Sequence, residues 1–310
     1  MRLHIVEYQK IELQRKNNIS HSMRYIIRKI HTMKHLYKIL LLFVLCGFCL
    51  GSQAQDLKII SFNIRYNSWN NIDGENGWPN RKAAVAKMIL EEQPAAIGLQ
   101  EALIDQLQYL DSALTHYRRI GVGRDDGKEA GEFMAIYYDT TRLELLSYRT
   151  RWLSETPDVP TKGWDAACYR TVTIARFHDR QSGKEFQYLN THLDHMGKTA
   201  RAEGVKLIVQ LLKENSISDN VPVIVGGDMN STIEDKIFQS FYHVNLKPAR
   251  ELTKNTSYVD TYNAYGKEKS ALIDHFFVRD VKVKQFRTLD GNYGVPYISD
   301  HYPIEVVIGL

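Results

Sequence analysis

The segment from Val221 to Asn230 places a short apolar run directly before two polar groups. Residues 223–225 are Val-Ile-Val, and such a continuous β-branched run is typical of a strand that is buried on both faces. Two glycines follow, then Asp228 and Asn230. Because strand side chains alternate, we expect these two on one side of the pleat, with the glycines allowing a ligand to approach the backbone. A carboxylate there can hold a cation or polarise a water, and the amide can orient an oxyanion. The alternative is a Gly-Asp turn in which Asn230 caps the next helix.

The first 54 residues have the pattern of a leader. Lys34 and Lys38 precede an apolar run, residues 39–50, and the small-residue sequence Ser-Gln-Ala ends at Ala54. This order predicts a secretory signal peptide that is cleaved near Ala54, with Met33 as the true start. The alternative is a retained membrane anchor, but the run is short for a membrane span. We therefore expect an exported protein, located in the periplasm or outside the cell.

Residues 1–54 hold 9 of the 40 Lys and Arg but only 2 of the 36 Asp and Glu. The remaining 256 residues therefore carry a net charge of −3, which argues against a strongly electrostatic binder of polynucleotides. Cys168 is the only cysteine after the leader, so this part of the chain has no disulfide framework and depends on its core. Its length suits one large α/β domain, residues 55–310.

Helix and strand patterns are mixed along this domain. Strand patterns cover residues 57–64, 95–100, 133–138, 143–153, 169–177, 186–192, 223–225, 272–278, 281–288 and 303–308, and helical patterns begin near Pro79 and cover 102–114, 200–215 and 237–241. This order predicts a layered α/β domain with substantial antiparallel pairing. We find no repeat, linker or low-complexity segment in it.

Several predicted strands end in polar residues that would be costly in a core. The residues that follow a strand are Asn63, Glu101, His192, Asp194, Asp228 and Asn230, whereas Asp274 lies just inside a strand and Asp300 and His301 open the last one. Ligand sites in layered α/β domains lie at strand ends, so these side chains are expected to converge. Oxygen ligands of this kind predict Mg²⁺ or Mn²⁺, not zinc, and the histidines add acid/base groups. Each residue also has an ordinary alternative as a turn residue, a cap, a solvated surface group or a core histidine.

The order and local context of these residues resemble the endonuclease/exonuclease/phosphatase superfamily, the deoxyribonuclease I-like fold, in a secreted bacterial-type form. The matching segments are residues 61–63 (Ser-Phe-Asn), 99–101 (Leu-Gln-Glu), 190–194 (Asn-Thr-His-Leu-Asp), 227–230 (Gly-Asp-Met-Asn), 273–275 (Ile-Asp-His) and 299–303 (Ser-Asp-His-Tyr-Pro). The resemblance extends from Leu57 to Leu310. It implies a four-layer sandwich of two mixed β-sheets packed face to face, with helices on both outer sides. It also implies metal-dependent cleavage of phosphate esters.

The resemblance implies a metal site and a group that prepares the attacking water. Asn63 and Glu101 correspond to metal-binding positions, with Asp300 nearby. Asp228 and Asn230 correspond to the groups that position the water and the scissile phosphate. A phosphate ester is anionic, so a metal and nearby cations must neutralise its charge before a water can attack in line.

The resemblance also implies an acid/base dyad and phosphate-binding groups. His301 and Asp274 correspond to the dyad, in which the carboxylate would fix the tautomer of the imidazole and favour its protonated form. His192 corresponds to a donor to the phosphate oxygens. Arg170 falls where a phosphate-facing side chain is expected, although its local match is looser.

The sequence leaves the substrate open. A phosphodiester is favoured, and the candidates are extracellular nucleic acid, phospholipid head groups and small phosphodiesters. Ile273-Asp-His-Phe lacks the Trp-Cys-Asp-Arg pattern of the inositol phosphatases. The four tryptophans, Trp69, Trp78, Trp152 and Trp164, either line a pocket or pack over the sheet edges. A catalytically inactive binding protein on the same fold is the alternative to an enzyme. We expect a monomer with no obligate protein partner.

Overall fold

The computed structural model describes residues 56–215, 221–267 and 269–310, together with residues 10, 12–16, 19–21, 23–25, 28–35 and 37–38. Contacts divide the chain into two units, Met1–Gln53 and Ala54–Leu310. The described residues of the first unit are helical and exposed. The apolar run and cleavage site of the leader lie outside the described residues, so the signal peptide stays a prediction. Within the described ranges, no helix is long and apolar enough to cross a bilayer.

The second unit contains two six-stranded sheets. The first has the order β11 (Lys282–Thr288), β12 (Ile304–Gly309), β1 (Leu57–Asn63), β2 (Ala96–Gln100), β4 (Ile136–Asp139) and β3 (Tyr117–Ile120). The second has the order β5 (Leu143–Trp152), β6 (Thr171–Asp179), β7 (Lys184–His192), β8 (Val223–Asp228), β10 (Asp274–Arg279) and β9 (Lys247–Pro248). Both sheets are mixed, because β1 with β2 and β7 with β8 are parallel whereas the other neighbours are antiparallel.

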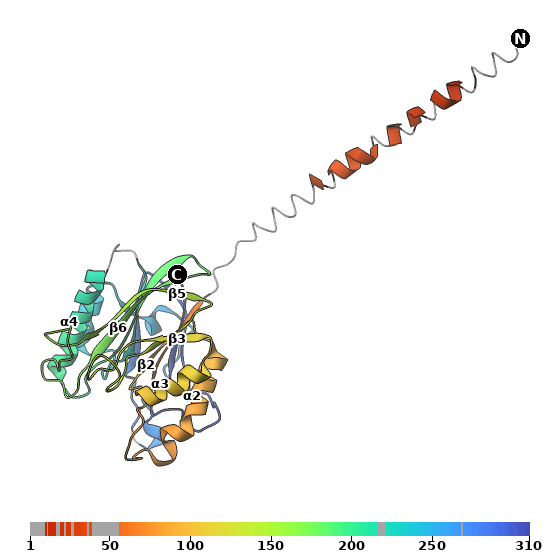
Figure 1. Cartoon of the computed structure of the whole chain (residues 1–310). Coiled ribbons are helices and arrows are strands. Elements are labelled where there is room, and N and C mark those ends of the chain that lie inside the picture. The colour runs from red at the N-terminus through yellow and green to blue at the C-terminus, as the bar shows by residue number, and fades with distance from the viewer. Residues whose placement is uncertain are drawn as a thin grey trace, which may run out of the picture. The chain divides into compact units, whose positions relative to one another are not determined.

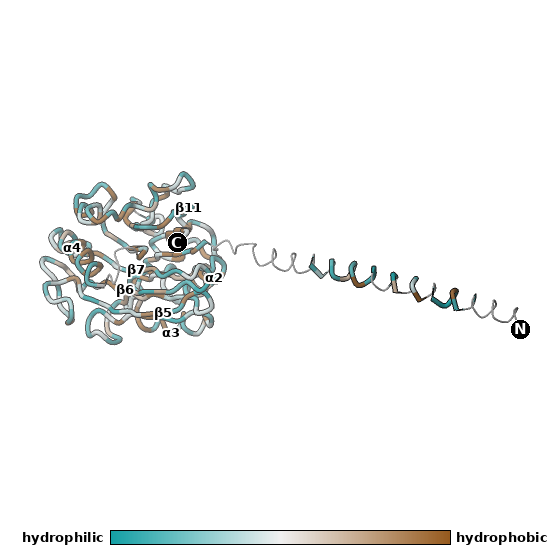
Figure 2. Tube along the Cα trace, turned by 90° about the horizontal axis from the view of Figure 1, so that it is seen from above, coloured by the Kyte–Doolittle hydropathy of each residue, from teal (hydrophilic) through white to brown (hydrophobic). Residues whose placement is uncertain are grey.

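Helices cover the outer face of each sheet. They are α2 (Trp78–Glu92) and α3 (Ile104–Ala113) on the first sheet, and α4 (Lys198–Asn215) and α5 (Gln239–Tyr242) on the second. Val85 and Met88 of α2 pack against the first sheet, and Val205 and Ile208 of α4 against the second. A further apolar cluster fills the space between the sheets. Figures 1 and 2 show α4 and the α2–α3 pair on opposite sides of the strands. The predicted four-layer sandwich is confirmed.

β8 is buried on both faces, as its sequence predicts. Val223 and Val225 pack in the cluster that contains α4, whereas Ile224 packs between the two sheets. Apolar side chains are therefore required at successive positions, which explains why the run shows no alternation.

The two glycines of β8 allow neighbouring residues to pack closely and do not make room for a ligand. A Cβ on Gly226 would overlap the ring of Phe276, and a Cβ on Gly227 would overlap the carbonyl oxygen of Thr191. The prediction that these glycines let a ligand approach the backbone is therefore wrong. They allow side chains and backbone of the neighbouring strands to fit closely against β8.

The structure also contains short elements that the hydropathy pattern does not reveal. They are β3, β9 and four 3₁₀ helices: η1 (Gly74–Asn76), η2 (Lys236–Phe238), η3 (Ala249–Leu252) and η4 (Ala264–Gly266). β3 is one of the two edge strands of its sheet, and its sequence, Tyr-Arg-Arg-Ile, shows no apolar alternation. Charged residues are common on edge strands because they discourage pairing with other chains.

The space between the sheets becomes polar toward the carboxyl ends of the parallel strands. Gln100 Nε2 donates to Asn190 Oδ1 (2.6 Å), and Asn190 Nδ2 donates to the carbonyls of Leu99 and Ala135 (2.8 Å each). Gly98 makes room for this contact, since a Cβ there would lie 2.7 Å from Asn190 Cγ. Asn190 therefore joins the two sheets, and the polar residues beyond it are held on two strand pairs in fixed positions.

Candidate active site

A cleft of about 550 Å³ lies where the parallel strands of both sheets end. Of the predicted site residues, Glu101, Arg170, His192, Asp228, Asn230, Asp300 and His301 line it. Asn63 and Asp274 lie behind this lining, and each is hydrogen-bonded to residues in it. The structure therefore brings all of the predicted site residues together.

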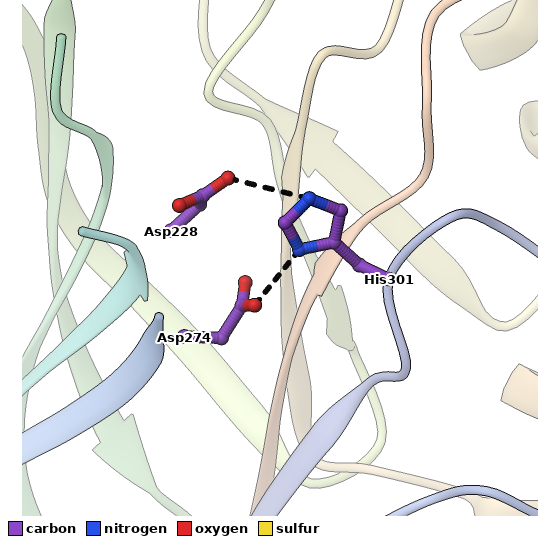
Figure 3. A group of neighbouring side chains, drawn as sticks. All are labelled: Asp228, Asp274 and His301. Carbon is purple, nitrogen blue, oxygen red and sulfur yellow. Dashed lines mark hydrogen bonds and ion pairs between the residues drawn. The ribbon is translucent and has the colours of Figure 1, made fainter. Parts of the chain in front are cut away.

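A histidine lies between two carboxylates at the base of the cleft (Figure 3). His301 Nδ1 is 2.8 Å from Asp274 Oδ2, and its Nε2 is 3.7 Å from Asp228 Oδ2. Burial lowers the pKa of His301, but the two carboxylates outweigh burial and raise it to about 10. Burial and the charge of Asp274 raise the pKa of Asp228 to about 7, against the opposing effect of His301. The imidazole is therefore charged at neutral pH.

The same three side chains offer ligand atoms within 4.8 Å of one another, as a metal site would. We interpret them as a proton-transfer group instead. The hydrogen bond to Asp274 occupies His301 Nδ1, so only Nε2 of this imidazole remains for another group. Oxygen ligands are also what Mg²⁺ and Mn²⁺ prefer.

The carboxylates of Glu101 and Asp300 form the part of the cleft best suited to a cation. Burial raises the pKa of Asp300, and the negative charge of Glu101 raises it further. Asn63 Nδ2 donates to Glu101 Oε1 (2.9 Å) and Asp228 Oδ2 (3.1 Å), while its Oδ1 accepts from Arg65 N (3.0 Å). Two carboxylates and an amide fit a hard cation by their chemistry. Asn63 presents its nitrogen to Glu101 here, so its role as a direct ligand stays a prediction.

Three cleft residues have left-handed backbone conformations, which are unusual for residues other than glycine. Their φ angles are 56° at Arg65, 62° at Glu101 and 48° at Asn230. Such conformations cost roughly 1–3 kcal/mol each and persist where the surrounding structure holds them, often at functional sites. In this cleft they turn the chain directly after β1, β2 and β8.

Asn230 reaches the cleft through this turn and not through the pleat of β8. The strand ends at Asp228, whose Oδ1 accepts from Asn230 N (2.9 Å). Asn230 Nδ2 lies 2.9 Å from Leu193 O and 3.0 Å from His192 Nε2. A carbonyl can only accept, so the amide nitrogen is the donor and His192 Nε2 accepts. The expectation that Asp228 and Asn230 share one side of a strand is therefore wrong, as is that of a helix cap.

His192 is buried and neutral in this arrangement. Burial lowers its pKa well below the usual range, and the nearby charges of Arg170 and Arg124 lower it further. Because Nε2 accepts from Asn230, the proton lies on Nδ1. Donation from His192 to a phosphate oxygen stays a prediction.

Arg170 is fixed in the cleft by two partners. Its Nε donates to Asp194 Oδ2 (3.2 Å), and its Nη2 lies 3.0 Å from His195 Nδ1. Asp194 also accepts from the backbone N–H of Gly197 (2.7 Å) and Ala167 (3.1 Å). Burial raises the pKa of Asp194, but these N–H groups and Arg170 outweigh it and hold the pKa well below its usual value. Arg170 Nη1 is buried with no hydrogen-bond partner among the described residues. Such a donor is suited to bind a phosphate oxygen.

Comparison with known proteins identifies the family to which a chain with this fold belongs. The model of the Endonuclease/Exonuclease/phosphatase family matches residues 60–301. The chain belongs to the endonuclease/exonuclease/phosphatase family. It is 33% identical to the mannosyl-6-phosphatase of Bacteroides thetaiotaomicron, over 82% of this chain and 100% of that one, with a TM-score of 0.77. An endonuclease/exonuclease/phosphatase from Bacteroides vulgatus is 36% identical over 83% of this chain and 99% of its own, with the same TM-score. An uncharacterized protein of Acanthamoeba polyphaga mimivirus is 24% identical over 81% of this chain and 99% of its own.

Two residues that hold the predicted site residues in place, Arg81 and Thr261, could not be identified from the sequence. The buried Arg81 of α2 donates from Nη1 to the carbonyls of Ile64 and Ile298 (2.8 Å each) and from Nη2 to Arg65 O (3.2 Å). It therefore holds the turn after Asn63 against the loop that carries Asp300. An arginine in an amphipathic helix is ordinarily read as a surface residue, so the sequence carries no signal for this role.

Thr261 connects the two members of the dyad. Its Oγ1 accepts from the backbone N–H of Ile273 (3.1 Å) and Asp274 (3.0 Å), and its carbonyl accepts from Tyr302 N (2.7 Å). The start of β10 and the segment before β12 are thus fixed to one residue. The cleft lining also includes Arg65, Tyr66, Arg124, Glu132 and Tyr262, none of which lies in the six short segments on which the sequence resemblance rests.

Proposed function

We propose that this protein is a Mg²⁺-dependent hydrolase that cleaves phosphate esters by in-line attack of water. The observation that carries the proposal is the charged His301 between Asp228 and Asp274, in the same cleft as Glu101 and Asp300. A buried imidazolium and a carboxylate whose pKa is about 7 form a matched acid and base at neutral pH. Mn²⁺ is a second cation of suitable chemistry.

Glu101 and Asp300 would hold the cation, with Asn63 beside them. The cation would neutralise negative charge on the phosphate. Arg170 Nη1, the buried donor with no partner among the described residues, would bind a phosphate oxygen. Asn230 would hold the attacking water through its amide oxygen, because its nitrogen is already engaged with Leu193 and His192.

The proton route in the proposed reaction uses the short distance between Asp228 and His301. Asp228 accepts a proton as the water oxygen forms the new P–O bond, and the ester P–O bond breaks as His301 Nε2 gives its proton to the leaving oxygen. Asp228 is then protonated and His301 is neutral. The 3.7 Å separation between Oδ2 and Nε2 would let one water molecule carry the proton back to His301 after the products leave.

The balance of charge in the cleft supports a small phosphate ester as the substrate, and the similarity to a mannosyl-6-phosphatase favours a monoester. Its cationic groups are Arg65, Arg124, Arg170 and His301, and its carboxylates are Glu101, Glu132, Asp228 and Asp300. The cleft therefore lacks the excess of positive charge with which proteins hold a polynucleotide backbone. The 33% identical relative is a mannosyl-6-phosphatase, which supports the same class of substrate. The phosphodiester favoured by the sequence becomes an alternative outcome of the test.

The test is a substrate panel with the protein from residue 55 onward. p-Nitrophenyl phosphate, mannose 6-phosphate, bis(p-nitrophenyl) phosphate and single-stranded DNA are each assayed with Mg²⁺ and with excess chelator. We expect Mg²⁺-dependent release of phosphate from the monoesters. Faster hydrolysis of a diester than of the monoesters would contradict the proposed substrate class. Full activity in excess chelator would contradict the metal requirement. Failure to hydrolyse any of the four would favour the inactive binding protein.

We also propose that the chain is exported and cleaved near Ala54. The charged, apolar and small residues from Lys34 to Ala54 support this proposal. Fractionation of cells that express the full chain should place the protein outside the cytoplasm, and N-terminal sequencing should begin near residue 55. An intact N-terminus at Met33 in the cytoplasmic fraction would contradict it.

A further inference from the structure

A hairpin beside the metal-binding carboxylates brings an ion pair into the wall of the cleft. The hairpin is closed by hydrogen bonds from Arg124 N to Glu132 O (3.1 Å) and from Asp125 N to Ala130 O (3.0 Å). Its base is tied to the residue after Glu101, because Phe133 N donates to Ala102 O (2.8 Å). The side chains of Arg124 and Glu132 therefore keep a fixed position relative to Glu101.

The pair formed by Arg124 and Glu132 is bidentate. Arg124 Nη1 lies 2.6 Å from Glu132 Oε2, and Nη2 lies 2.8 Å from Oε1. Trp152 Nε1 donates to the carbonyl of Arg124 (2.7 Å), which fixes the backbone of the arginine as well. Both side chains line the cleft and are mostly buried, with 11% and 15% of their surface exposed. The two side chains therefore present a preorganised set of polar atoms to the cleft, unlike a mobile ion pair on the outside of a protein.

The pair keeps hydrogen-bonding capacity toward the cleft. Each oxygen of Glu132 uses one of its acceptor sites on Arg124, so further sites are free for a ligand. Each terminal nitrogen of Arg124 has a second N–H. The pair has no net charge and offers both hydrogen-bond donors and acceptors. It therefore matches hydroxyl groups, each of which can donate and accept a hydrogen bond. A second phosphate would instead meet the carboxylate of Glu132 directly.

We propose that Arg124 and Glu132 bind the hydroxyl groups of the leaving alcohol, so that the enzyme selects phosphate esters of sugars or other polyols. This inference rests on the proposed phosphatase activity and adds a leaving-group subsite to it. The position of the pair supports it, because Arg124 and Glu132 line the same cleft as Glu101 and Arg170. A molecule whose phosphate lies between Glu101 and Arg170 would place its alcohol beside the pair.

The test compares how variants discriminate between two monoesters. Mannose 6-phosphate supplies hydroxyl groups, and hexyl phosphate supplies a leaving group of similar length without them. For the wild type we expect a higher kcat/KM on the sugar phosphate. In Glu132→Gln the ratio of the two kcat/KM values should fall by about tenfold or more, the effect of losing a hydrogen bond to a charged group. The loss should appear mainly as a higher KM.

Glu129→Gln is the matched control, because it removes the same charge from the exposed tip of the hairpin. Its ratio should equal that of the wild type. An unchanged ratio in Glu132→Gln, or a wild type that treats both esters alike, would overturn the subsite. The second measurement needs no variant and so does not depend on how well Glu132→Gln folds. Absence of hydrolysis of either ester would instead contradict the proposed function itself.

Discussion

Replacement of His301 by alanine should lower kcat by at least about a hundredfold, the usual range for loss of a general acid. The reason is that the imidazolium at the base of the cleft is the proposed proton donor to the leaving oxygen, with 3.7 Å between its Nε2 and Asp228 Oδ2. His116→Ala is a suitable control, because this histidine is exposed and does not line the cleft. The measurement is steady-state turnover of the best substrate at saturating Mg²⁺.

The effect of His301→Ala on folding must be separated from its effect on turnover. The substitution leaves the buried carboxylate of Asp274 without its 2.8 Å partner, and an uncompensated buried charge is destabilising. His301→Gln keeps a hydrogen-bond donor but cannot carry a proton to the leaving group. It should therefore remain folded, as judged by its melting temperature, and still lose turnover. A His301→Gln variant that retains wild-type kcat would contradict the role of general acid.

The partner Asp274 should act only through His301. Asp274→Asn should lower kcat by less than His301→Ala does, and the double variant should match His301→Ala. When two residues function as a unit, the effects of replacing them on kcat do not add, so the second substitution should cause no further loss of kcat. Single losses that multiply in a folded double variant would show that the two residues work independently.

The polar residues at strand ends could be predicted because their signal is local. Asn63, Glu101, His192 and Asp228 each follow an apolar strand pattern directly, and a polar group at that point has little use in a core. The order of the six matching segments then placed them in one fold. Even so, the reason given for Asn230 was wrong, because backbone conformation at a strand end is not encoded in alternation.

The rest of the cleft depends on contacts between distant parts of the chain. Arg81 joins carbonyls that are 17 and 217 residues away in sequence, and nothing in its helix marks it. Arg124 and Glu132 lie in the cleft wall on a hairpin that is tied to Ala102, the residue after Glu101. The role of Gly226 and Gly227 also depends on distant residues. A glycine pair beside a carboxylate suggested that a ligand approaches the backbone, whereas Phe276 and Thr191 occupy the space next to the two glycines.

Substitution of Glu101 by glutamine should make activity depend strongly on the concentration of Mg²⁺. Glu101 is fixed by Asn63 Nδ2 (2.9 Å) and Tyr66 N (3.3 Å), and it lies close enough to Asp300 for its charge to act on that group. Loss of its charge weakens the attraction for a hard cation while the shape of the side chain is kept. Since a bound cation contributes several kcal/mol of charge stabilisation, activity at low Mg²⁺ should fall at least about a hundredfold.

High Mg²⁺ should restore part of this loss, because mass action compensates for a weaker site. The same change should be visible without turnover: Mg²⁺ should raise the melting temperature of the wild type at lower concentrations than it does for Glu101→Gln. Glu91→Gln removes a charge from the exposed face of α2 and should behave as the wild type in both experiments. If Glu101→Gln and the wild type respond to Mg²⁺ at the same concentrations, Glu101 does not bind the cation.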